Sequence, residues 1–172
     1  MNNLLYIDKR LEKKYFEGKG YGLKAKEEIE ANTIIIKEKP SFCLESNEKI
    51  FSDIFQLLYK ILNNDDIHLK CKFLKLLPQN LKNFPIDKNK IQLELNKLKK
   101  HNLAIFNYFQ IFYSLDDIYL YCAKYMCNAF QFNDNPVILL NATLINHSCI
   151  PNVIFGNKED IMYFKTIRKI NF

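Results

Sequence analysis

The stretch Ala142-Thr-Leu-Ile-Asn-His-Ser-Cys-Ile-Pro-Asn152 decides how this chain is interpreted. Its second half, from Asn146 to Asn152, is a dense polar run between two apolar segments, 137–140 and 153–155. Asn and His side chains offer both donors and acceptors to a ligand, and Pro151 fixes the backbone where the run ends. A polar run of this kind between two buried strands predicts a binding site.

Two other kinds of site use the same residue types. A Cys–His catalytic pair would need His147 and Cys149 to meet, and side chains two residues apart seldom reach the required geometry. A zinc site needs more ligands at regular spacing, and the five cysteines include no Cys-x-x-Cys pair. We therefore predict no bound metal and free thiols.

A second motif lies near the start of the chain. Gly18-Lys-Gly-Tyr-Gly22 places three of the four glycines within five residues. Glycine permits positive φ and lets the backbone approach a ligand closely. The motif lacks the Lys-Ser/Thr ending of a phosphate loop and the spacing of a dinucleotide fingerprint. By itself it is more typical of a tight hairpin than of a ligand site.

Periodicity predicts strands at both ends of the chain and helices between them. Residues 15–16, 23–25 and 33–36 read as strands, and so do 153–155 and 161–167, joined by a five-residue loop at 156–160. Apolar residues spaced by three and four predict core-packing helices at 50–62 and 69–77, and a six-turn helix over 91–112. Ser114 followed by Asp117 predicts a capped helix over 116–129. Strands split around a helical insert predict one α+β domain.

The composition excludes several classes of protein. The 172 residues suit one domain, and 48% hydrophobic residues can build a core. The net charge of +6 comes almost wholly from Lys, which is over-used together with Asn, Ile, Phe and Tyr, all of which have AT-rich codons. With only two Arg, we expect no direct nucleic-acid partner. The polar N-terminus and the lack of a long apolar run predict no membrane segment and a nuclear or cytoplasmic location.

Taken in order, these motifs resemble the SET-domain protein-lysine methyltransferases. The resemblance rests on segments spread over nearly the whole chain: 18–25, the strand pair within 29–40, Asn128-Ala-Phe130, 142–152 and 164–170. The Asn-x-Phe element and the long helical block make it most similar to the SET-and-MYND subgroup. The implied fold has SET-domain β-sheets with a large helical insertion. Its parts would be N-terminal SET strands at 1–46, the insertion at 47–132 and the C-terminal SET core at 133–172.

The resemblance also implies a function, a cofactor and a site. The function is methyl transfer from S-adenosyl-L-methionine to a lysine of a histone tail or another protein, with a role in chromatin. The glycine motif and the 146–152 run would form two halves of one cofactor pocket. The residues implied to contact the cofactor are Lys19, Gly20, Tyr21, Asn128, Asn146 and His147. The alternative is a SET-fold binding or scaffold module without catalysis.

This chain departs from the family pattern in two places. Family members continue into a Glu-Leu…Tyr element whose tyrosine flanks the methyl-transfer channel, whereas this sequence ends at Asn171-Phe172. We therefore expect 1–172 to be a C-terminally incomplete SET domain of low activity, and the catalytic residue is unknown. The MYND zinc finger, expected between about 44 and 50, is also missing. The sequence does not predict an oligomeric state.

Overall fold

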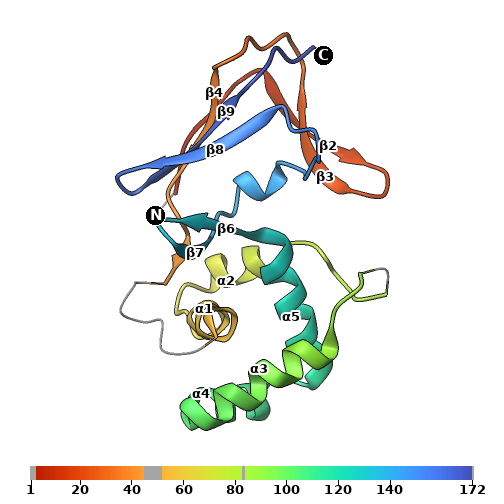
Figure 1. The fold of residues 1–172 in the computed structure, drawn as a ribbon. Coiled ribbons are helices and arrows are strands. Elements are labelled where there is room, and N and C mark those ends of the chain that lie inside the picture. Colours follow the sequence, from red (N-terminus) through yellow and green to blue (C-terminus); the bar gives the residue numbers. More distant parts are fainter. Residues whose placement is uncertain (1–2, 45–51, 83, 172) are drawn as a thin grey trace. The chain divides into compact units, whose positions relative to one another are not determined.

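The chain folds into two compact units. The computed structural model describes residues 3–44, 52–82 and 84–171 (Figure 1). Unit 1 comprises Met1–Ser41 and Leu139–Phe172, and unit 2 comprises Phe42–Ile138. Unit 1 holds mainly strands and unit 2 holds the helices, which confirms the predicted α+β class with a helical insertion. The predicted boundary between 46 and 47 lies outside the described residues.

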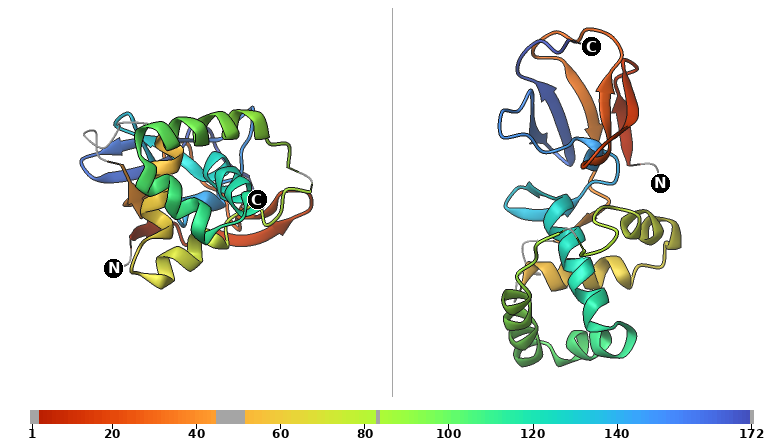
Figure 2. Two further views of the ribbon diagram at one scale, coloured as in Figure 1. Left: turned by 90° about the horizontal axis from the view of Figure 1, so that it is seen from below. Right: turned by 90° about the vertical axis from the view of Figure 1, so that its right-hand side faces the viewer.

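Unit 1 contains an antiparallel sheet built from both ends of the chain. Its strands, in spatial order, are β1 (Leu4–Ile7), β4 (Ile34–Glu38), β9 (Ile161–Thr166) and β8 (Val153–Lys158) (Figure 2). The β-branched run at the start of β4 suits a strand. Ile36, Met162 and Phe164 are almost fully buried. They supply much of the apolar core beneath the two central strands.

A separate hairpin in unit 1 carries the glycine motif. Strand β2 (Leu11–Phe16) pairs with β3 (Gly20–Ala25) from Leu11 opposite Ala25 to Phe16 opposite Gly20. Gly18 has a φ of 71° and Gly20 a φ of 73°. Residues with a β-carbon adopt positive φ values of this size only with strain. The tight hairpin that the glycines predicted is therefore present.

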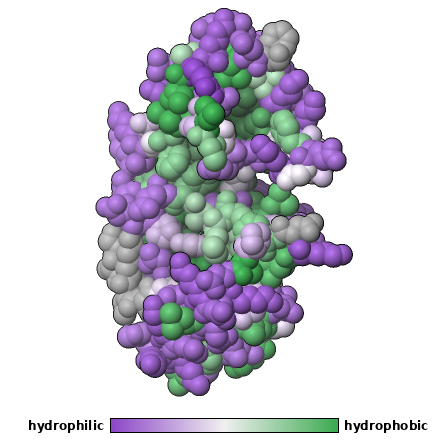
Figure 3. Space-filling view, turned by 45° about the vertical axis from the view of Figure 1, so that its right-hand side comes forward, coloured by the Kyte–Doolittle hydropathy of each residue, from purple (hydrophilic) through white to green (hydrophobic). Residues whose placement is uncertain are grey.

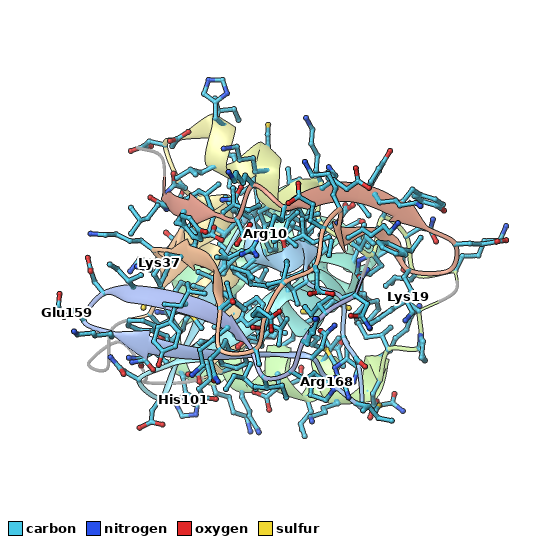
Figure 4. All side chains as sticks on the ribbon, turned by 90° about the horizontal axis from the view of Figure 1, so that it is seen from above. Arg10, Lys19, Lys37, His101, Glu159 and Arg168 are labelled. Atoms are coloured by element: carbon cyan, nitrogen blue, oxygen red, sulfur yellow. The ribbon has the colours of Figure 1, made fainter. Side chains whose placement is uncertain are left out.

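The hairpin of β8 and β9 is tighter than predicted. The predicted five-residue loop at 156–160 is wrong, because Gly156 through Lys158 remain paired with strand β9. Only Glu159 and Asp160 form the turn (Figure 4). A β-carbon on Gly156 would lie 2.5 Å from the Tyr163 hydroxyl. The glycine therefore makes room for a tyrosine on the paired strand instead of marking the turn.

Unit 2 consists of helices around a small sheet. The helices are α1 (Asp53–Leu62), α2 (Ile67–Leu74), α3 (Lys88–His101), α4 (Leu103–Phe112) and α5 (Leu115–Asn128). The strands, in spatial order, are β5 (Phe42–Cys43), β7 (Asn135–Ile138) and β6 (Ala129–Phe132). Phe55 of α1 and Phe109 of α4 are fully buried with ring centroids 5.4 Å apart. The predicted first helical residues, 50 and 51, lie outside the described part of the chain.

The predicted six-turn helix over 91–112 is wrong. The helix breaks at Asn102 (φ −148°, ψ 86°), whose side chain accepts a hydrogen bond from the Ile105 N–H at 3.0 Å and so caps α4. Asn favours this N-cap position because its side chain competes for backbone donors. The predicted cap at Ser114 and Asp117 is confirmed as a complete capping box. Over the residues that can be described, no helix combines the length and apolar character needed to cross a membrane.

Candidate functional site

A pocket of about 240 Å³ lies within unit 1. Its wall is apolar, formed by Leu11, Phe16, Leu23, Ala25, Ile35, Ile145, Val153 and Ile170. Its polar lining consists of Lys19, Asn146, His147, Ser148 and Asn152. The β2–β3 hairpin and the 142–152 stretch, far apart in sequence, thus line one cavity. An apolar wall with a few convergent polar groups is typical of small-molecule sites.

Gly22 and Asn146 show why the two motifs fit together. A β-carbon on Gly22 would lie 2.2 Å from Nδ2 of Asn146 and 3.1 Å from the Phe16 ring. Real β-carbons do not approach an amide nitrogen this closely, so only glycine lets the Asn146 side chain rest on strand β3. The third glycine of the motif therefore serves the pocket, whereas Gly18 and Gly20 serve the turn.

Glu38 holds the start of the 142–152 stretch. It ends strand β4 with no exposed surface, and its carboxylate accepts hydrogen bonds from the backbone N–H groups of Asn141 (3.0 Å) and Ala142 (2.8 Å). The Asn141 side-chain amide donates a third bond at 3.0 Å. Burial raises the pKa of the Glu38 carboxyl, and these hydrogen bonds oppose the shift. We call these hydrogen bonds from Asn141 and Ala142 to Glu38 the Glu38 clamp. The 3₁₀ helix η2 (Ala142–Leu144) begins at the clamp and leads to Asn146.

None of the sequence motifs pointed to Glu38. One signal was available, because strand alternation puts Glu38 on the same face as Ile36 and opposite to Lys37, and a Glu on a buried face needs buried donors. Nothing in the sequence says which donors those are.

The turn after Asn146 is closed by local hydrogen bonds. The Ser148 hydroxyl accepts from the Ile150 N–H at 3.2 Å and donates to the Ile150 carbonyl at 3.0 Å. The Arg168 guanidinium donates to the same carbonyl at 2.9 Å. These bonds fix the backbone that carries His147.

His147 and Cys149 lie closer than we expected. Nε2 of His147 is 3.6 Å from Sγ of Cys149, so the two side chains meet although they are only two residues apart. Both side chains are exposed. A catalytic base also needs a group that orients it. Among the described residues, the His147 side chain makes no hydrogen bond besides this one.

Two predicted cofactor contacts on the β2–β3 hairpin, Gly20 and Tyr21, lie outside the pocket lining. Tyr21 is 56% exposed, with its ring 5.5 Å from that of Tyr15 and the Lys13 Nζ 4.5 Å from its centroid. Gly20 opens strand β3 opposite Phe16 and shapes the turn. By contrast, Lys19 lines the pocket, and Figure 4 shows its position. Contact of Gly20 and Tyr21 with a cofactor stays a prediction.

Asn128 belongs to unit 2, at the end of α5. Its side-chain amide donates to the carbonyls of Leu77 and Lys124, both at 2.7 Å. One turn earlier, the buried Lys124 ammonium donates to the carbonyls of Leu76 (2.5 Å) and Pro78 (2.6 Å). Burial lowers the pKa of Lys124 to about 8. Together the two side chains anchor the 76–78 segment to α5, and the predicted role of Asn128 at a cofactor stays a prediction.

The described residues hold no group of three or more His, Cys, Asp or Glu side chains arranged for a metal ion.

Sequence comparisons place these features in a wider set of proteins. The model of the SET domain family matches residues 20–171. A SET domain-containing protein of Acanthamoeba polyphaga mimivirus is 42% identical over 167 residues, which covers 96% of this chain and 65% of that protein. The chain thus spans just under two thirds of the length of this viral relative.

Solved structures share the fold. The SET domain of LSMT bound to lysine and AdoHcy aligns with a TM-score of 0.64 over 98% of this chain and 50% of that one, at 16% identity. The same domain bound to methyl-lysine and AdoHcy also gives 0.64, over 98% of this chain and 49% of that one. The predicted SET-domain fold is therefore confirmed.

Proposed function

This chain belongs to the SET-domain family, and we propose that it forms the cofactor pocket of an S-adenosylmethionine-dependent protein-lysine N-methyltransferase. The observation that carries the proposal is the contact of Asn146 with Gly22 beside a pocket that Lys19 and His147 also line. The AdoHcy in the two structural neighbours, the product of this cofactor, supports the same proposal.

The pocket residues fit the chemical groups of S-adenosylmethionine. The apolar wall suits the flat adenine ring, and Asn146 and His147 offer donors and acceptors for its polar edge or for the amino group. Lys19 brings a positive charge that suits the carboxylate of the methionine part. The cavity of about 240 Å³ is small. Pockets that enclose a whole drug-sized ligand are larger, so this lining would hold part of the cofactor.

Bound S-adenosylmethionine would supply a sulfonium methyl group, whose carbon bonds to the lysine nitrogen as its bond to sulfur breaks, leaving AdoHcy and a methylated amine that loses a proton. The protein must hold nitrogen and methyl in line at about 3–3.5 Å. It must also keep the lysine neutral, which a desolvating environment favours by lowering the amine pKa. Asn146 and His147 would contribute by fixing the cofactor, since the Glu38 clamp and the Ser148 turn hold their backbone.

We propose a lysine of another protein as the methyl acceptor. Histone tails are the first substrates to test, because they are rich in lysine, and a nuclear or cytoplasmic location would follow from such a substrate. Placement in the SET-and-MYND subgroup remains a prediction from the Asn128-Ala-Phe130 element and the helical insertion.

Calorimetric titration of S-adenosylmethionine into the chain tests the proposal. We expect saturable binding, and a loss of at least tenfold in affinity, about 1.4 kcal/mol, in an Asn146→Ala, His147→Ala variant. The matched control makes the same two changes at exposed positions outside the pocket, Asn96→Ala and His68→Ala, and should bind like the wild type. Equal affinity of all three proteins would move the site elsewhere, and no binding to the wild type would contradict the proposal. Cofactor binding without methylation of any lysine-rich protein would favour the scaffold alternative.

A further inference from the structure

Helix α4 and the turn that follows it present an exposed apolar surface. Leu103 and Ile111, eight residues apart and on the same side of the helix, are 56% and 72% exposed. Phe112 and Leu115, at and just beyond the C-terminal end of the helix, are 66% and 45% exposed, and we call these four residues the α4 surface. No residue from Asn102 to Leu115 carries a charge. On the face drawn in Figure 3, apolar side chains gather in patches among hydrophilic ones. Exposed apolar clusters of this kind mark contact surfaces.

Charges of opposite sign flank the α4 surface. At its N-terminal end α3 finishes with the exposed residues Lys99, Lys100 and His101, and α3 contacts α4, to which the single residue Asn102 joins it. At its C-terminal end α5 begins with Asp116, whose side chain is 88% exposed. Asp116 lies 3.9 Å from Lys88, but both side chains are more than half exposed, and such pairs contribute little. Helix α4 is ten residues long, and a helix of that length separates the two charged ends by about 15 Å.

We propose that two copies of this chain associate through the α4 surface, with their α4 helices antiparallel about a two-fold axis. In a two-fold interface each contact occurs twice. Lys100 of each copy then faces Asp116 of the other, whereas a parallel arrangement would bring like charges together. An anionic membrane would attract the lysines but repel Asp116, so the charge pattern favours a second copy.

The association is weak and depends on concentration. A single helix pair buries less than the roughly 1,200–2,000 Å² of stable interfaces. Each copy also carries a net charge of +6. At physiological ionic strength, charges are screened beyond about 8 Å, so the general repulsion fades while close Lys–Asp pairs persist.

Sedimentation equilibrium over a range of concentrations gives the first test. We expect the dimer fraction of the wild type to grow with concentration. In Ile111→Asp the association constant should be at least tenfold lower. The control, Ile67→Asp, changes a 55% exposed isoleucine on α2 and should associate like the wild type. A wild type that stays monomeric throughout, or an Ile111→Asp variant that dimerises normally, would overturn the proposal.

Charge exchange tests the antiparallel arrangement. Lys100→Glu alone and Asp116→Lys alone should each weaken the dimer, and an equimolar mixture of the two variants should restore it as a heterodimer. Carrying both changes in one chain should restore the homodimer. A mixture no better than its components would contradict the arrangement. The wild type could instead bind phosphatidylserine vesicles while Ile111→Asp does not, with no dimer detected. That result would overturn the dimer and identify a membrane as the partner of the α4 surface.

Discussion

Replacement of Glu38 by alanine tests whether one buried carboxylate holds the stretch that carries Asn146 and His147. The change removes the acceptor of three hydrogen bonds, from the Asn141 and Ala142 N–H groups and the Asn141 amide. A buried donor left unpaired costs about 1–3 kcal/mol, and the half-buried Asn141 can turn to water, so we expect unfolding free energy to fall by about 2–4 kcal/mol. S-Adenosylmethionine affinity should fall with it.

Glu38→Gln separates shape from charge. It keeps one acceptor oxygen and turns the other into a donor facing N–H groups, so we expect a smaller loss of about 1–2 kcal/mol. Burial raises the folded-state pKa of Glu38 above its unfolded value of 4.5, so the folded chain binds the proton more tightly. That contribution to stability is complete below pH 4.5 and is lost as pH rises through the raised folded pKa. The stability difference between wild type and Glu38→Gln should therefore narrow as pH rises above 4.5.

Urea unfolding followed by circular dichroism measures these changes, and hydrogen exchange at the Ala142 amide reports on the clamp directly. Glu12→Ala, an exposed change on β2 that removes the same charge, is the control. If the unfolding free energy of Glu38→Ala lies within about 0.5 kcal/mol of that of Glu12→Ala, the usual range of surface substitutions, Glu38 does not hold the stretch. Unchanged protection of the Ala142 amide would lead to the same conclusion.

Three further changes test single contacts. Gly22→Ala puts a β-carbon 2.2 Å from Nδ2 of Asn146, so calorimetry should show a loss of at least about tenfold in S-adenosylmethionine affinity, and normal binding would disprove the packing. Burial lowers the folded pKa of Lys124 from 10.5 to about 8. Wild-type stability should therefore rise relative to Lys124→Met as pH increases between those two values, by about 3 kcal/mol. A flat difference in urea unfolding across that range would count against a buried ammonium. Ser114→Ala removes the hydroxyl that accepts from the Asp117 N–H. Thermal unfolding should then show a loss of about 0.5–2 kcal/mol, and an unchanged midpoint would contradict the capping box.

Local chemistry made parts of the fold predictable. The capping box at Ser114 depends on residues three apart, and the glycine turn at Gly18 depends on its own backbone torsion. Periodicity failed where a local competitor overrode it, because the Asn102 side chain caps α4 and interrupts an apolar pattern that continues across it. The predicted turn failed at Gly156, because this glycine leaves space for the Tyr163 side chain on the paired strand.

The sequence by itself determined the family, the mixed class and the two motifs of the pocket, because each depends on residue types and short spacings. Only the tertiary structure decided that Asn146 rests on Gly22, that Glu38 holds Asn141 and Ala142, and that the four residues of the α4 surface are exposed within the described part of the chain. The physical reason is that hydrophobic periodicity tells which face of an element is apolar, whereas strand register and long-range packing decide what meets it.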